Sequence, residues 1–167
     1  VSADVVVRIT GDCPLADPTL IDKCIQEFRQ LNVDYFSNIN PATYPDGLDV
    51  EVMTIGSLEK ANNEANTDFD REHVTPYIRH SEFFNKASLT NDSDFSDFRW
   101  TVDEPEDLEV ISSVFEHFSP DLFFSWKKVL ELQQAKPSLF KINNHITRNE
   151  GAVMGSGQKL YKRAKQI

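Results

Sequence analysis

Hydrophobic and polar positions in the first forty residues predict a strand, a helix and a second strand. Residues 4–10 hold a near-continuous run of β-branched side chains, which is typical of a strand covered on both faces in a mostly parallel sheet. Asp17 followed by Pro18 is a helix start, and apolar side chains then recur at helical spacing as far as Leu31. Residues 34–39 predict the second strand.

The middle of the chain continues this alternation of strands and helices. Residues 48–54 alternate between two sets of side chains, one of which is acidic, and this predicts a strand with an acidic face. Ser57 is expected to cap a helix that ends near Ala65, and Asp70 is expected to cap another. Pro76 would kink this second helix unless it lies in the first turn.

The clearest helix signals follow a predicted strand at 98–102. Residues 103–107 place acidic side chains and a proline at a helix start, as the helix dipole favours. Residues 119–121 repeat this device, and the helix that follows ends before Pro137. Strands that alternate with helices indicate an α/β fold, and 167 residues suffice for one domain with a core.

The charge of the chain narrows the classes of partner. It has 17 basic and 27 acidic residues, which gives a formal net charge of −10. A surface this acidic repels a phosphate backbone, so we expect no nucleic-acid partner. A nucleotide substrate stays compatible with the charge, because carboxylates can hold a divalent cation that bridges to phosphate.

Cysteine usage and hydropathy predict a cytoplasmic location. Cys13 and Cys24 are too few for a disulfide framework. The sequence shows neither a secretory hydrophobic region nor a long apolar run, so we expect no membrane association. Cys13 lies beside Asp12 but has no base near it in sequence, which favours a small packing residue over a nucleophile.

Asp12 and Asp103 each follow a predicted strand, at 4–10 and 98–102. Ligands of open α/β sheets bind beyond the carboxyl ends of the strands, so both carboxylates are expected in one crevice. Two hard oxygen ligands with open positions for water and phosphate suit Mg²⁺. The alternative is structural, with Asp12 as a turn residue and Asp103 as a helix cap.

A second polar cluster surrounds His73, with Arg71 and Arg79 close to it in sequence. One interpretation is that these basic groups hold an anionic sugar acid or a phosphate. The other is a solvated helix face, and the pattern alone favours neither.

Four separated motifs resemble one known family. They read Arg-Ile-Thr-Gly-Asp-Cys-Pro-Leu at 8–15, Tyr-Pro-Asp-Gly-Leu-Asp-Val-Glu at 44–51, Arg-Glu-His-Val-Thr-Pro-Tyr-Ile-Arg at 71–79, and Arg-Trp-Thr-Val-Asp-Glu-Pro-Glu-Asp-Leu-Glu at 99–109. In this order they closely resemble the spore-coat polysaccharide biosynthesis F-type cytidylyltransferases, relatives of the acylneuraminate and 3-deoxy-manno-octulosonate cytidylyltransferases. The similarity covers about residues 1–152, and the segment 143–151 also looks like the C-terminal segment of this family.

The resemblance implies a fold, a reaction and a set of site residues. The fold is α/β, a Rossmann-like nucleotidyltransferase sheet of the glycosyltransferase-A type, mixed and flanked by helices. The reaction is transfer of CMP from CTP to the hydroxyl of a sugar or sugar acid, with release of pyrophosphate, for surface polysaccharide synthesis. Asp12 and Asp103 would be the catalytic pair that holds Mg²⁺. The residues expected to bind substrate lie in the same motifs: Arg8, Asp46, Arg71 and His73.

The resemblance also predicts a domain organisation. Family members open with a strand and a basic, glycine-containing loop that grips the triphosphate and the base, and nothing in this sequence corresponds to them. We therefore expect a partial cytidylyltransferase domain over 1–152, inactive in isolation and destabilised by an unpaired sheet edge. Residues 153–167 are expected to be a linker, then a short basic helix from Gln158. The segment 155–167 looks like the opening of a glutamate-1-semialdehyde-type aminotransferase, a pyridoxal-phosphate enzyme, which implies a covalent fusion.

Two other functions stay open at this point. The domain would be a non-catalytic module that binds a sugar nucleotide or dimerises, carried by the aminotransferase, with the acidic strand 48–54 and the following helix as its interaction surface. Alternatively, a glycosyltransferase of the same fold would consume a nucleotide sugar instead of making one. A homodimer is compatible with the enzymatic reading as well.

Overall fold

The computed structural model describes residues 3–148 and contains a four-stranded sheet in the order β1-β3-β2-β4. β3 is antiparallel to both of its neighbours, whereas β2 and β4 are parallel, so the sheet is mixed. The strands are β1 (Val5–Arg8), β2 (Tyr35–Ser37), β3 (Glu51–Thr54) and β4 (Lys86–Ser88). The expected linker and basic helix at 153–167 lie outside the described residues.

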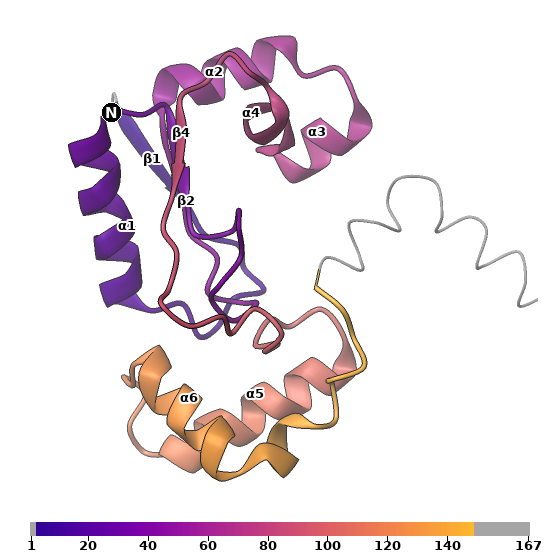
Figure 1. Cartoon of the computed structure of the whole chain (residues 1–167). Coiled ribbons are helices and arrows are strands. Elements are labelled where there is room, and N and C mark those ends of the chain that lie inside the picture. The colour runs from indigo at the N-terminus through magenta and orange to yellow at the C-terminus, as the bar shows by residue number, and fades with distance from the viewer. Residues whose placement is uncertain (1–2, 149–167) are drawn as a thin grey trace, which may run out of the picture.

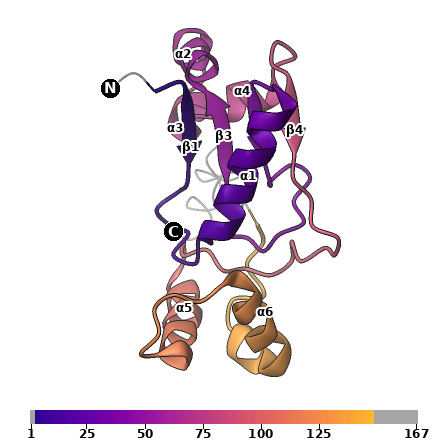
Figure 2. The same cartoon turned by 90° about the vertical axis from the view of Figure 1, so that its left-hand side faces the viewer.

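Helices flank this sheet on both sides and at one end (Figures 1 and 2). Helix α1 (Pro18–Leu31) packs against β2 and β3 on one face. Helices α2 (Ile55–Glu64), α3 (Asp68–His73) and α4 (Pro76–His80) gather on the other side, and α5 (Pro105–Phe118), α6 (Trp126–Ala135) and the 3₁₀ helix η1 (Pro137–Phe140) lie beyond the end of the sheet. The predicted α/β fold with a mixed sheet flanked by helices is confirmed. Within residues 3–148 we find no helix with the length and apolarity that crossing a bilayer requires.

Two helix starts follow their local sequence signals closely. The Asp17 side chain accepts a hydrogen bond from the Leu20 amide at 3.0 Å, and Pro18 begins α1, as expected. Glu104 and Asp107 form a reciprocal capping box around Pro105 at the start of α5. These predictions hold because a cap acts within one turn of the chain.

Other predicted helix boundaries are wrong by a few residues. Thr54 rather than Ser57 caps α2, and Thr67 rather than Asp70 caps α3. In both cases a threonine three residues upstream accepts the amide hydrogen bond. Pro76 does not kink a helix, because it begins a separate one, α4.

The helix predicted after 119–121 begins later, at Trp126, with Ser125 at its N-cap. Leu122 and Phe123, expected on its apolar face, are 66% and 92% exposed. Asp121 accepts the Phe123 amide in a local turn, and this turn delays the helix.

The strand predictions are partly wrong as well. The β1 strand is shorter than 4–10 and lies at the edge of the described sheet, so Val7 is 38% exposed rather than covered on both faces. The predicted strand 48–54 shrinks to β3, and its Glu51 is only 3% exposed, so it presents no solvated acidic face. The sequence analysis missed β4, whose Lys-Ala-Ser sequence carries no apolar run.

Residues 98–102 do not form the predicted strand. They make one bridge, in which the Asp46 amide donates to the Phe98 carbonyl at 2.8 Å and the Trp100 amide donates to the Asp46 carbonyl at 2.7 Å. Pairing ends there because the neighbouring chain turns away at Gly47, where φ is +103°. A Cβ at Gly47 would lie 2.5 Å from the Trp100 carbonyl carbon, so only glycine fits this approach.

Gly47→Ala is therefore expected to lower the free energy of unfolding by at least about 2 kcal/mol, through backbone strain and overlap with the Trp100 main chain. Urea denaturation of the two proteins measures this difference. Gly56→Ala is the control, since a Cβ inside α2 would meet nothing closer than 4.0 Å. It should be neutral or stabilise by up to about 1 kcal/mol. Equal stability of wild type and Gly47→Ala would contradict the close approach.

Candidate active site

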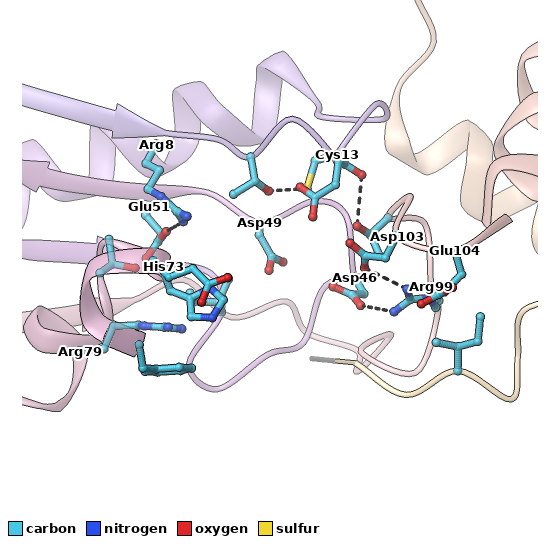
Figure 3. A pocket seen from close by; sticks show the side chains of 18 of the residues that line it. Arg8, Cys13, Asp46, Asp49, Glu51, His73, Arg79, Arg99, Asp103 and Glu104 are labelled. Atoms are coloured by element: carbon cyan, nitrogen blue, oxygen red, sulfur yellow. Dashed lines mark hydrogen bonds and ion pairs between the residues drawn. The ribbon is translucent and has the colours of Figure 1, made fainter. Parts of the chain in front are cut away.

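A cleft of about 750 Å³ lies at the end of the sheet where β1 finishes and β3 begins. Arg8, the last residue of β1, and Glu51, the first of β3, pair in register and both line it. Figure 3 shows that Asp46, Arg99 and Asp103 gather toward one end, which we term the acidic end. Arg8 and His73 lie toward the other end, which we term the basic end, with Arg79 beside them.

Asp12 and Asp103 both line this cleft. Their backbones are tied together, because the Asp12 carbonyl accepts the Val102 amide at 2.8 Å and the Thr101 hydroxyl at 3.1 Å. Burial and the negative charge of Asp12 raise the pKa of Asp103. The structure thus brings together the two aspartates that the sequence placed after separate strands, although the second of these segments is not a strand.

Arg99 and Arg148 link the carboxylates of the acidic end. Arg99 is buried and contacts Asp46 at 3.4 Å. Arg148 donates to Asp49 at 2.5 Å, and its Nε lies 3.8 Å from the other carboxylate oxygen of Asp46. Both arginines are therefore occupied by protein carboxylates, and neither is free to neutralise a phosphate.

Asp46 has an unusual electrostatic environment. Burial outweighs its two ion pairs, which are long, and raises its pKa to about 6. Burial likewise raises the pKa of Asp49 despite the nearby Arg148. Asp46, expected to bind substrate, does line the cleft, and the sequence analysis missed its neighbour Asp49, which lies in the same matched motif.

The basic end holds two arginines in different states. Arg8 is paired with Glu51, whose other oxygen accepts the Tyr35 hydroxyl at 2.5 Å. Arg79 reaches into the cleft from α4, and its buried Nε has no hydrogen-bond partner among the described residues. His73, from the end of α3, lines the cleft beside them. Arg79 therefore has a hydrogen-bond donor, its Nε, that no described residue uses.

Arg71, expected to bind substrate, does not line this cleft. It lies on the other side of α3, in a groove of about 420 Å³ with Val74, and donates to the Asn62 carbonyl at 3.2 Å. Sequence spacing placed Arg71 near His73, but the two residues lie on different faces of one short helix. Arg79, in α4, lines the cleft instead.

Cys13 behaves as the sequence analysis expected of a packing residue. It is 8% exposed, and burial raises the pKa of its thiol to about 12. The thiol therefore stays protonated at neutral pH and donates weakly to Asp12 at 3.7 Å.

The carboxylates of Asp12 and Asp103 are of a kind that would suit a divalent cation whose other ligands are phosphate oxygens and water. Residues 3–148 contain no group of three or more His, Cys, Asp or Glu side chains that would enclose a metal. Mg²⁺ seldom needs such a cage, because it is commonly held by one or two carboxylates together with phosphate oxygens and water. Asp12 and Asp103 supply that number.

Open α/β sheets bind their ligands in a crevice at the carboxyl ends of strands, as this cleft lies, and comparison with known proteins identifies the class of enzyme. A family model described as cytidylyltransferase matches residues 1–146. A solved cytidylyltransferase from Leptospira borgpetersenii superposes with a TM-score of 0.77 at 31% identity, over 83% of this chain and 59% of that one. The chain belongs to the cytidylyltransferase family.

Two curated relatives extend the comparison. An uncharacterized protein of Methanocaldococcus jannaschii is 34% identical over 87% of this chain and 59% of its own length. The spore coat polysaccharide biosynthesis protein SpsF of Bacillus subtilis is 33% identical over 70% of this chain and 49% of its own. This chain thus spans about half the length of the curated relatives it matches.

The pKa of Asp46 generates a testable pH dependence. A carboxyl whose pKa is raised from 3.8 to about 6 binds its proton more tightly when folded. Its contribution to stability is therefore complete below about pH 4 and is lost as the pH rises through 6. The difference in unfolding free energy between wild type and Asp46→Asn should fall by up to about 3 kcal/mol from pH 4 to pH 7. Urea melts across this range measure it, and a constant difference would contradict the raised pKa.

Proposed function

We propose that this chain supplies the acceptor side and the metal ligands of a Mg²⁺-dependent cytidylyltransferase, which transfers CMP from CTP to a sugar hydroxyl and releases pyrophosphate. The observation that carries the proposal is the convergence of Asp12 and Asp103 in one cleft of a chain that belongs to this family. The similarity to SpsF, a spore coat polysaccharide biosynthesis protein, supports surface polysaccharide as the destination of the activated sugar.

The state of the arginines supports a metal at the acidic end. Arg99 and Arg148 are each engaged by carboxylates, so the charge of a triphosphate needs another counterion there. Asp12 and Asp103 would hold Mg²⁺, which when bound neutralises charge on the α-phosphate and makes its phosphorus more electrophilic. The protein's own part is to hold the Asp12 loop, through the Asp12 carbonyl, against the segment that leads to Asp103.

The remaining cleft residues would bind and orient the acceptor sugar. Arg79 and His73 offer donors to its polar or anionic groups from one side. Asp49, with 31% of its side chain exposed and a raised pKa, is the carboxylate available to accept the hydroxyl proton. The hydroxyl oxygen then bonds to the α-phosphorus as the bond to the β-phosphate oxygen breaks, and pyrophosphate leaves.

The test uses the complete protein encoded by the gene, with CTP, Mg²⁺ and a panel of neutral sugars, amino sugars and sugar acids. Pyrophosphate release identifies the acceptor. With that acceptor, Asp12→Asn and Asp103→Asn should each lower kcat at least about a hundredfold, because charge stabilisation at the α-phosphate is lost.

Asp22→Asn is the matched control, because Asp22 is an exposed aspartate on α1 that does not line the cleft, and the kcat of this variant should match wild type. Wild-type turnover in both cleft variants would refute the metal assignment. If no sugar releases pyrophosphate and CTP gives no binding heat with Mg²⁺, the chain is instead a non-catalytic module.

A further inference from the structure

A buried ion pair between Arg99 and Asp107 lies at the acidic end and contacts Asp103, one of the two proposed metal ligands. Neither member of the pair is itself proposed as a ligand. We infer that Asp107 and Arg99 are positioning residues, which hold the Asp103 carboxylate in the orientation that binds the cation. This inference rests on the proposed function, because it concerns how Asp103 performs its role there.

Asp107 is the anchor of the arrangement. Its side chain is completely buried, so it cannot reach a cation in the cleft. Its Oδ2 accepts the Asp103 amide at 3.1 Å and the Glu104 amide at 3.0 Å, and its Oδ1 accepts the Asn143 amide group at 2.9 Å. Through these contacts the buried Asp107 side chain holds the backbone of Asp103.

Arg99 extends this anchor to the Asp103 side chain. Its Nε and Nη2 donate to the two oxygens of Asp107 at 2.8 and 2.7 Å, a bidentate contact that fixes the plane of the guanidinium. Nη2 then donates its second hydrogen to Oδ2 of Asp103 at 2.9 Å. Asp103 is consequently held at both its amide and its carboxylate by one rigid pair.

The contacts leave Asp103 with a free coordinating atom. Arg99 uses Oδ2, and no described residue donates a hydrogen bond to Oδ1. The side chain of Asp103 is 51% exposed, so without this contact it would sample several rotamers in the cleft mouth. Holding one oxygen therefore orients the other at low entropic cost.

The positive charge of Arg99 does not argue against this role. A lone guanidinium would repel a cation beside Asp103, but Arg99 is also paired with Asp107 and Asp46. Its charge is more than balanced by the carboxylates around it, and the local field stays favourable to a divalent cation. The pair orients Asp103 without competing for its negative charge.

The experiment must separate this role from simple structural support, because breaking a buried ion pair destabilises any protein. We would titrate the complete protein with Mn²⁺ and measure the free ion by electron paramagnetic resonance, which reports metal affinity independently of turnover. Three variants change the proposed ligand, the arginine that contacts it, and the residue that contacts Asp107: Asp103→Asn, Arg99→Lys and Asn143→Ala. Trp100→Phe is the matched control, since it removes a buried hydrogen bond to Gln133 in the same segment without touching Asp103.

Asp103→Asn should raise the Kd for Mn²⁺ at least about tenfold, and Arg99→Lys should raise it by about tenfold, as loss of outer-shell partners commonly does. Asn143→Ala, which leaves every charge in place, should raise it about threefold. Trp100→Phe should lower the melting temperature and leave the Kd within about twofold of wild type.

If Arg99→Lys had the same Kd as the Trp100→Phe control, the inference would be overturned. The metal assignment would still stand in that case, provided that Asp103→Asn raised the Kd. If Asp103→Asn itself left the Kd unchanged, the proposed function would fail instead, and the inference with it. Should Arg99→Lys not fold, Asn143→Ala decides: a Kd raised about threefold supports the inference, and one equal to the control overturns it.

Discussion

One guanidinium, that of Arg99, organises the end of the sheet where the candidate site lies. It is buried among the carboxylates of Asp46, Asp103 and Asp107, which come from a loop, a turn and the first turn of α5. Removing the charge would leave the buried carboxylates of Asp46 and Asp107 without compensation, which is strongly destabilising in a protein interior. Arg99 thus ties the loop that carries Asp46 to the first turn of α5.

A second tie brings the other proposed ligand to the same place. The Asp12 carbonyl accepts hydrogen bonds from Thr101 and Val102, so the loop after β1 lies against the segment that leads to Asp103. Gly47 permits the loop 44–50 to pass under Trp100 and adds Asp46 from a third direction. Three matched motifs thus meet in one cleft through backbone contacts, and the side-chain chemistry follows from that frame.

The two ends of the cleft suit different parts of a transfer reaction. The acidic end has its arginines engaged and offers carboxylates, which favours a metal-bound phosphate. The basic end offers Arg79, whose Nε lacks a partner among the described residues, and favours an acceptor with polar or anionic groups. This difference between the two ends of one cleft is the physical basis for the donor and acceptor sides that we propose for a chain of the cytidylyltransferase family.

The sequence by itself determined the features that depend on neighbouring residues: the capped start of α1 at Asp17, the helix start within 103–107, and the motifs that resemble the family. Only the tertiary structure decided which distant groups meet. In the structure, the predicted strand 98–102 is reduced to a single bridge at Arg99, and Arg71 lines a different groove from the cleft. The reason is physical: caps act within one turn, whereas pairing and burial depend on segments that are about ninety residues apart in the chain, as Asp12 and Thr101 are.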